Sequence, residues 1–149
     1  MKKLLLLLAI GCMALGLVCC GGQNPPEPET PAEPEVPEGT TLIKVPRVQV
    51  QPMGTCIAYM LYDDESGKAF VYPLLLKEGE TDVEPGKTYV FPGEMNKAYA
   101  YWMLSDYTTH ALYTEATFKK TLKNDTLMHI DATASDTNGD KWMLVFDQN

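Results

Sequence analysis

Two histidines, His110 and His129, are the side chains of this 149-residue chain that ordinarily exchange protons near neutral pH. His129 and Asp131 are two residues apart, so on a β-strand they share a face, where a carboxylate can orient an imidazole as a general base. The sequence contains no GxSxG, HExxH or P-loop pattern beside them. We therefore expect these residues to form a solvated polar strand face in a protein that is not an enzyme.

The run Asp136-Thr137-Asn138-Gly139-Asp140 has spaced oxygen ligands, as calcium loops do. A calcium loop also needs glycine at its sixth position and a bidentate glutamate at its end. Here the sixth position is Lys141, and no such glutamate follows. The same residues suit a hairpin turn, so we expect no metal ion and no cofactor.

The chain has four cysteines, of which three lie within its first 20 residues and only Cys56 lies beyond them. A disulfide framework is therefore excluded for the rest of the chain. Cys56 stands in the apolar stretch TCIAYMLY, which predicts a buried and unreactive thiol.

The first 20 residues have the features of an export signal. Lys2 and Lys3 precede an apolar run from Leu4 to Val18, which is shorter than the roughly 20 residues that span a bilayer. The run ends in LVCC, which resembles the lipobox of bacterial lipoproteins, with Leu17 at position −3. By that resemblance, Cys20 receives the lipid that anchors the mature chain in a membrane.

Two neighbouring cysteines are weaker lipid acceptors. Choosing Cys19 would place the bulkier Val18 at position −1, and Cys12 has only a short apolar run before it. In the lipoprotein family, a residue other than Asp after the acceptor directs the protein to the outer membrane. Gly21 at that position implies an outer-membrane lipoprotein, with the face of the membrane left open.

Residues 21–39 have the composition of an extended tether. They contain six of the eleven prolines and five glutamates, and no Lys or Arg. Removal of the signal leaves 10 basic against 20 acidic residues, and residues 40–149 carry all 10 basic and 15 of the acidic ones. This balance excludes nucleic acid as a partner, because phosphate binding needs a basic face.

Residues 40–149 read as a single β-domain, because β-branched and aromatic runs alternate with turn signals. Segment 94–104 is compatible with either a short helix or a strand. Its Ala, Met and Leu residues favour a helix, whereas its Tyr and Trp residues favour a strand. The expected strands are 42–51, 55–62, 69–76, 87–91, 110–122, 127–136 and 140–147.

Asn138-Gly139 is a strong two-residue hairpin signal, because both positions of such a turn need a positive φ. The implied register pairs Asp136 with Lys141, Ala134 with Met143 and Ala132 with Val145. It places Trp142 and Phe146 on the face opposite the expected core.

The preceding hairpin turns near residues 123–125. Strand 110–122 would place one apolar set on the core side, and a loop of three or five residues would set Phe118 opposite Ile130. The members of that apolar set are Leu112, Ala116, Phe118 and Leu122.

Short connections predict an antiparallel meander of seven to eight strands that closes into a small barrel, with a β-sandwich as the alternative. The lipobox, the acidic Pro-rich spacer and the hairpin DTNGDKWMLVF together resemble the small lipocalin-like lipoproteins of Gram-negative bacteria. The resemblance implies a lipid-anchored β-domain. In addition, Asp125-Thr126-Leu127 resembles an O-glycosylation acceptor of some bacterial surface lipoproteins, which would make Thr126 the modified residue.

All 14 aromatic residues lie in residues 40–149, and one group of them is clustered in the sequence. Rings bordered by Asp, Thr and Ser suit a core, a sugar, another small amphipathic ligand or a partner protein. We expect a membrane-anchored binding module, with a structural or assembly subunit of an envelope complex as the alternative. The clustered rings are Tyr99, Tyr101, Trp102, Tyr107 and Tyr113. The expected ligand contacts are Trp142, Phe146, Tyr99 and Trp102.

Overall fold

The computed structural model of the protein describes residues 34–149. Residues Val36–Asn149 form one compact unit. The expected signal, the lipid acceptor Cys20 and the tether up to residue 33 lie outside the described residues, so these expectations stay predictions.

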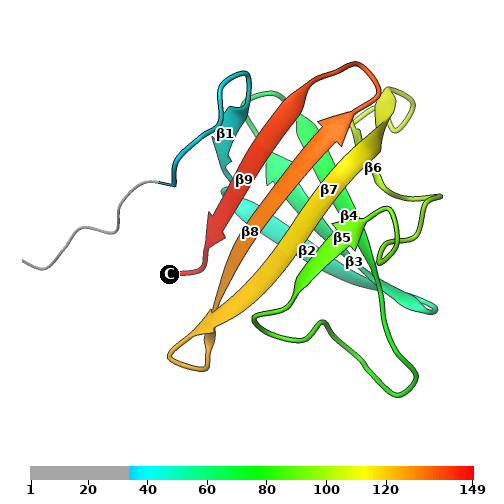
Figure 1. The fold of residues 1–149 in the computed structure, drawn as a ribbon, viewed down its shortest axis with the longest axis vertical. Coiled ribbons are helices and arrows are strands. Elements are labelled where there is room, and N and C mark those ends of the chain that lie inside the picture. The colour runs from blue at the N-terminus through cyan, green and yellow to red at the C-terminus, as the bar shows by residue number, and fades with distance from the viewer. Residues whose placement is uncertain (1–33) are drawn as a thin grey trace, which may run out of the picture. The chain divides into compact units, whose positions relative to one another are not determined.

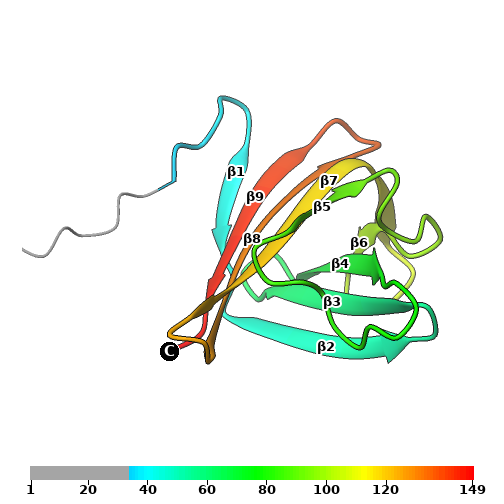
Figure 2. The same ribbon diagram turned by 60° about the horizontal axis from the view of Figure 1, so that its bottom comes forward.

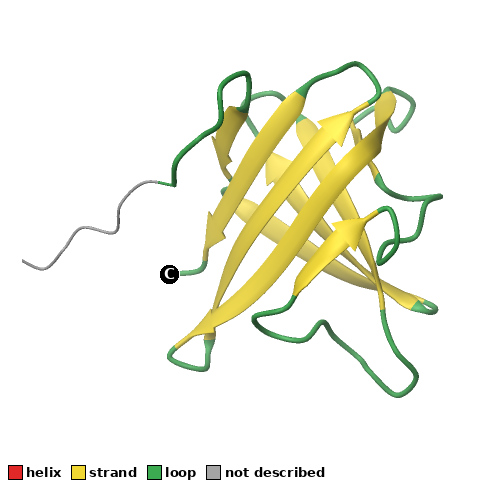
Figure 3. Ribbon diagram, in the orientation of Figure 1, coloured by secondary structure: helices red, strands yellow, loops and turns green. Residues whose placement is uncertain are grey.

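The described part of the chain contains nine β-strands and no helix. Figure 3 shows this all-β composition. Segment 94–104, for which the sequence allowed helix or strand, contributes the three-residue strand β6 and a bridge between Leu74 and Met95. The strands are β1 Thr41–Lys44, β2 Arg47–Met53, β3 Cys56–Asp63, β4 Lys68–Leu75, β5 Thr88–Phe91, β6 Tyr101–Met103, β7 His110–Lys123, β8 Leu127–Asp136 and β9 Lys141–Asp147.

The strands form one continuous sheet in the order β1-β9-β8-β7-β6-β4-β3-β2, with β5 added beside β7. The sheet curls into a half-barrel, in which β7, β8 and β9 form one wall and β2, β3 and β4 the other (Figures 1 and 2). The predicted all-β fold is thereby confirmed, and it is consistent with a small lipocalin-like barrel. The sheet has nine strands rather than seven or eight, and it is mixed because β1 runs parallel to β9.

The expected single strand 42–51 is wrong, because the chain changes partners at Val45-Pro46. β1 pairs with β9, and β2 pairs with β3 at the other end of the sheet order. The Val45 amide still donates to the Val145 carbonyl at 2.8 Å, whereas Pro46 has no N–H with which to continue the ladder. Since only two residues join β1 to β2, the two ends of the sheet are held near each other, which curls it.

β7 carries an irregularity that the sequence pattern does not reveal. Its register against β8 shifts between Tyr113 and Glu115, so the inward-facing residues change parity along the strand. Tyr113, Ala116 and Phe118 face the core, while Leu112 lies on the surface. The expectation that Leu112 and Leu122 share the core side is therefore wrong, since Leu122 is also exposed near the strand end.

The hairpin between β7 and β8 has the predicted odd loop, because Lys123 pairs with Leu127 and three residues connect them. Phe118 lies opposite Ala132 rather than Ile130. Both of these β8 residues are fully buried, so the predicted face is right although the partner is displaced by two residues.

The β8–β9 hairpin is present, but its predicted register is wrong by one residue. Four residues, Thr137–Asp140, separate the two strands, and the Asp136 amide donates to the Asp140 carbonyl at 3.0 Å, which closes a three-residue loop, Thr137–Gly139. Of these three residues only Gly139 has a positive φ, of 86°. Ala134 therefore pairs with Trp142 and Ala132 with Leu144. This one-residue shift turns Trp142 and Leu144 inward, because side chains alternate along a strand.

Large side chains fill the inside of the half-barrel. Tyr59, Tyr72, Phe70 and Phe118 are each at most 1% exposed, and Tyr72 and Phe118 pack with ring centroids 5.5 Å apart. Cys56 is buried as predicted, and burial raises the pKa of its thiol. The packed interior leaves the outer surface as the place to look for a binding site.

Candidate functional site

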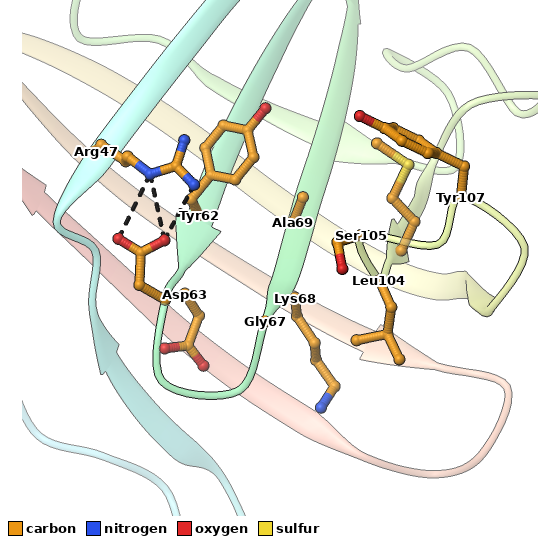
Figure 4. Close-up of a pocket in the computed structure, with 11 residues that line it drawn as sticks. Arg47, Tyr62, Asp63, Gly67, Lys68, Ala69, Leu104, Ser105 and Tyr107 are labelled. Carbon is orange, nitrogen blue, oxygen red and sulfur yellow. Dashed lines mark hydrogen bonds and ion pairs between the residues drawn. The ribbon is translucent and has the colours of Figure 1, made fainter.

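A cleft of about 430 Å³ lies where the β3–β4 hairpin meets the turn that follows β6. Figure 4 shows its side chains, which come from the start of β2, the two ends of the hairpin and the β6–β7 connection. Residues that matter for its chemistry are Arg47, Tyr62, Asp63, Asp64, Lys68 and Tyr107.

Arg47 forms one fixed wall of the cleft. Its guanidinium carbon lies 3.8 Å from the centroid of the Tyr62 ring, and its Nε and Nη2 donate to Asp64 Oδ1 at 3.2 and 3.0 Å (Figure 4). The hydrogen bond with Asp64 raises the pKa of Arg47 further above its usual value. Stacking and pairing together hold the planar guanidinium in one orientation.

The carboxylate of Asp63 organises the hairpin turn rather than the cleft. Its two oxygens accept hydrogen bonds from the Glu65 amide and the Ser66 hydroxyl, and the Gly67 amide donates to its backbone carbonyl at 2.8 Å. Such local bonds are the usual reason for Asp at the start of a turn. Both acidic side chains of the cleft, Asp63 and Asp64, are therefore committed to partners within the protein.

Lys68 is the second basic residue of the cleft. Its ammonium lies 5.0 Å from the Trp102 ring centroid, and within the described residues it makes no ion pair. It pairs in register with Asp63, but no ion pair joins its ammonium to the Asp63 carboxylate, and Figure 4 draws no dashed line between them. Lys68 thus presents an uncommitted cation to the cleft.

The turn opposite the hairpin is tightly hydrogen-bonded. Leu104 N donates to Thr109 O at 2.8 Å, and Tyr107 N donates to Leu104 O at 3.0 Å. Asp106 accepts from the amides of Thr108 and Thr109, each at 2.9 Å, and from the Thr109 hydroxyl. The bonds from Thr109 are the main reason that the pKa of Asp106 falls to about 2.

This turn holds Tyr107 in an unfavourable conformation at the rim of the cleft. The residue has a φ of 59°, which is rare for a bulky side chain, and its side chain is 79% exposed. Core packing therefore does not explain the ring. Strained residues that the surrounding structure fixes in place are concentrated at functional sites, so Tyr107 is the strongest candidate contact residue.

The four ligand contacts expected from the sequence do not form one exposed site. Trp102 and Trp142 are both less than 10% exposed and pack edge to face with ring centroids 6.3 Å apart. Phe146 is partly buried against the core, and Tyr99 is 42% exposed. Only Trp102 touches the cleft indirectly, as the ring beneath Lys68.

A buried carboxylate holds the Trp102 ring beside the β8–β9 hairpin. Asp136 is 3% exposed, and its Oδ2 accepts from Trp102 Nε1 at 2.8 Å. Its Oδ1 accepts from the amides of Asn138 and Asp140, each at 3.0 Å. The acidic run that resembles a calcium loop is therefore a hairpin whose first carboxylate is saturated by protein donors.

The two histidines lie far apart. His129 is paired across the sheet with Thr121, which is eleven residues along β7 from His110, or roughly 35 Å of strand. Each ring nitrogen of His129 has a carboxylate partner, Asp147 at 2.6 Å and Asp131 at 3.0 Å. The predicted shared face of His129 and Asp131 is confirmed, and the two carboxylates occupy both ring nitrogens, so neither nitrogen is left for a substrate.

Another charged cluster ties the long loop before β5 to the barrel. Asp82 accepts from the Tyr59 hydroxyl at 2.5 Å and from the Lys120 ammonium at 2.7 Å. Burial and the bond to Asp82 raise the pKa of Tyr59. Desolvation raises the pKa of Asp82, but the bonds from Lys120, Tyr59 and the Val83 amide outweigh it and lower the pKa. These groups satisfy one another and do not line the cleft.

Sequence reasoning included Tyr107 in an aromatic cluster but missed Arg47, Tyr62 and Lys68 as site residues. These three are distant in sequence and meet only through strand pairing. A local signal for Tyr107 does exist in Ser105-Asp106-Tyr107-Thr108-Thr109, because Asp followed by Thr predicts a side-chain-capped turn and an aromatic residue has no core to fill there.

Comparison with protein-family models, with curated proteins and with solved structures finds no significant match to this chain. Among residues 34–149, no helix is long and apolar enough to cross a membrane. The same residues contain no group of three or more acidic, His or Cys side chains arranged to hold a metal ion. The candidate function accordingly depends on the geometry of the cleft.

Proposed function

We propose that the protein is a lipid-anchored lipoprotein of the bacterial outer membrane, and that its β-domain is a non-enzymatic module that binds a glycan in the Tyr107 cleft. The observation that carries this proposal is the exposed Tyr107 ring, which a hydrogen-bonded turn holds beside a cleft with polar walls. A glycan is the amphipathic ligand that such a site suits best.

The chemistry of the cleft supports a sugar. Aromatic rings pack against the apolar C–H faces of sugars, and polar groups around them bond the hydroxyls. Tyr107 offers the ring and Lys68 an uncommitted donor, while Arg47 and Asp64, paired with each other, form a fixed polar wall. Fixed groups lose little conformational entropy when a ligand binds.

The packing of the barrel favours an outer site over an internal one. The inward-facing positions of β3, β4, β7 and β8 carry large, fully buried side chains. A ligand inside the barrel would have to displace them, whereas a ligand in the surface cleft displaces none. The proposal therefore differs from a barrel that encloses its ligand.

The anchor is proposed from the sequence, because Cys20 and most of the tether lie outside the described residues 34–149. Cys20 stands in the lipobox-like LVCC, and the Pro- and Glu-rich residues 21–39 follow it. An extended tether of that length reaches about 60 Å at roughly 3.1 Å per residue. Such a distance suits a module that meets its ligand away from the lipid surface.

Binding is tested with the mature protein, purified in detergent, on an array of neutral and acidic glycans. We expect binding to one glycan class and a loss of at least about tenfold in affinity for Tyr107→Ala. Tyr99→Ala is the matched control, since Tyr99 is also exposed but does not line the cleft. Absence of glycan binding, or equal losses for both variants, would contradict the proposal.

Anchoring is tested separately by mass spectrometry and membrane fractionation. Cys20→Ala should abolish the added mass of the acyl chains and release the protein from the membrane fraction, because an acyl chain contributes roughly 0.8 kcal/mol per buried methylene. Cys12→Ala is the control and should leave the protein anchored. A membrane-bound Cys20→Ala variant would contradict lipidation at this cysteine.

A second candidate function is an assembly subunit of an envelope complex, and the edge of β2 favours it. Among the described strands, β2 pairs only with β3, and most of its residues, including Val50, are exposed. An open strand edge can accept a strand from another chain. Sedimentation of the mature protein and of its Val50→Lys variant tests this function. An assembly subunit should associate through the edge of β2, and the charge at residue 50 should weaken that association.

A further inference from the structure

We infer that the ligand of the cleft carries a negative charge that Lys68 receives, so that the bound glycan is an acidic one bearing a carboxylate or a sulfate. This inference rests on the proposed function, because it specifies the ligand of the same cleft. It is carried by the pairing of charges around the cleft.

Three of the four charged residues at the cleft already have charged or hydrogen-bonding partners. Arg47 makes two bonds of 3.4 Å or less to Asp64 through Nε and one of 3.0 Å through Nη2. Asp63 accepts from the Glu65 amide and the Ser66 hydroxyl. A ligand that replaced these partners would gain little, because it would break bonds of the same kind.

Lys68 is the exception, and the hairpin turn explains why. Lys68 and Asp63 lie directly opposite each other on β4 and β3, where opposite charges ordinarily pair. The bonds from Glu65 and Ser66 hold the Asp63 carboxylate over the turn. In Figure 4, no dashed line joins the Lys68 ammonium to the Asp63 carboxylate, and no ion pair forms between them. The turn thus prevents the cross-strand ion pair.

The surroundings of Lys68 favour an anion over water alone. Its ammonium lies 5.0 Å from the centroid of the buried Trp102 ring, and the apolar Met103 and Leu104 also line the cleft. A ring face attracts a cation but accepts none of its hydrogen bonds fully, so N–H donors remain available. A carboxylate or sulfate placed there would form charge-assisted bonds in a partly apolar setting, where they are stronger than in bulk water.

The charge of the whole domain restricts the ligand to one or a few negative groups. Residues 40–149 contain 15 acidic and 10 basic side chains. An extended polyanion would meet the general negative field of the domain, which repels it. A short glycan with a single acidic group meets Lys68 within the cleft and extends its neutral part towards Tyr107.

The experiment compares three matched glycans that differ in one group: a neutral sugar, its carboxylate-bearing form and its sulfated form. Affinities are measured for the mature protein in detergent by titration calorimetry. We expect one or both acidic forms to bind about tenfold more tightly than the neutral form. The comparison between the carboxylate and the sulfate identifies which acidic group fits.

Lys68→Met should reduce affinity for the acidic form about tenfold and leave affinity for the neutral form within about twofold. Lys68→Arg should retain the preference, because it keeps the charge. Lys77→Met is the matched control, since Lys77 is exposed beyond the other end of β4 and does not line this cleft. Thermal unfolding of each variant verifies that it is folded.

The possible outcomes separate this inference from the proposed function. Equal binding of neutral and acidic forms, unchanged in Lys68→Met, would overturn the inference and leave glycan binding in place. Binding of no form at all would overturn both. If Lys68→Met does not fold, the salt dependence of the unaltered protein decides, because affinity for the acidic form should fall with rising salt and affinity for the neutral form should not.

Discussion

At the scale of single residues, Tyr107 combines strain with exposure, which gives a test that separates function from stability. The left-handed conformation costs a bulky residue about 1–2 kcal/mol, and glycine adopts it freely. Tyr107→Gly should therefore raise the free energy of unfolding by about 0.5–1 kcal/mol after the entropy of glycine is counted. Urea titration measures this gain, and the glycan assay should show lost binding.

Tyr99→Gly is the control for this gain in stability. Tyr99 is also exposed, but it is not among the residues with a positive φ. Tyr99→Gly should lower the free energy of unfolding of the protein by about 0.5–1 kcal/mol. Glycine relieves no strain at this position and only adds conformational entropy to the unfolded chain. Equal effects at Tyr99 and Tyr107 would show that the turn does not strain the Tyr107 backbone.

Asp136 is the residue that links the β8–β9 hairpin to the Trp102 ring. Asp136→Ala would leave the buried Trp102 Nε1 and the partly buried amides of Asn138 and Asp140 without their acceptor. Bonds to a charged group contribute about 1.5–3 kcal/mol each, so we expect a loss of at least about 3 kcal/mol in the free energy of unfolding. Asp140→Ala, at an exposed side chain, should cost less than about 1 kcal/mol.

At the scale of elements, the loop of the β8–β9 hairpin distinguishes two turn geometries. Of its three residues, only Gly139 has a positive φ. Gly139→Ala should lower the free energy of unfolding by about 1 kcal/mol or more, whereas Asn138→Ala should cost less than about 0.5 kcal/mol. A two-residue turn would make both substitutions costly, because both positions would need a positive φ. Thermal unfolding of the two variants measures the difference.

The hairpin also shows how far the sequence predicts this fold. Alternating β-branched and aromatic runs locate most of the strands, because that pattern is local, although they join β1 and β2 into one strand and leave β6 open. The pairing register of β8 with β9, however, depends on the length of the loop between them. A three-residue loop in place of a two-residue loop moves Trp142 from the outer face to the core. The bulge beside Tyr113 acts in the same way on Leu112. Both irregularities are single-residue events that leave no mark in the periodicity.

The site was less predictable than the strands for a related reason. Tyr107 has a local signature, but Arg47 and Lys68 lie 21 residues apart and meet through the pairing of β2, β3 and β4. Arg47 reaches the hairpin because the chain changes partners at Pro46, which hydrophobic pattern alone does not indicate. The uncommitted charge of Lys68 is visible only once the turn bonds of Asp63 are known.

At the scale of the whole molecule, the two walls of the half-barrel are joined by polar ties at one end. Lys120 on β7 reaches Tyr59 on β3 at 3.1 Å, and both bind Asp82 from the loop between β4 and β5. The loop is further held by the buried Val83 and by the bond from the Glu84 amide to the Tyr89 hydroxyl. Protonation of these groups therefore affects the whole fold rather than one turn.

The stability of the fold should accordingly form a plateau in pH with two edges. The pKa values of Asp82 and Asp147 are lowered from 3.8, so their contribution is complete above about pH 4 and is lost as pH falls through the lowered values. Burial raises the pKa values of Tyr59, Tyr72 and Tyr113 above 10, so stability falls as pH rises beyond about 10. Urea unfolding followed by tryptophan fluorescence from pH 2 to 11 measures both edges.

Two substitutions test whether the Asp82–Tyr59–Lys120 contacts cause the loss of stability at low and at high pH. Asp82→Asn should make the loss of stability at low pH shallower, because the asparagine has no charge to lose as the pH falls. Tyr59→Phe should make the alkaline edge shallower, since one fewer buried phenol must ionise. Glu78→Gln, at an exposed site in the same loop, is the control and should leave both edges in place. An acid edge that is unchanged in Asp82→Asn would mean that the tie does not hold the two walls together at neutral pH.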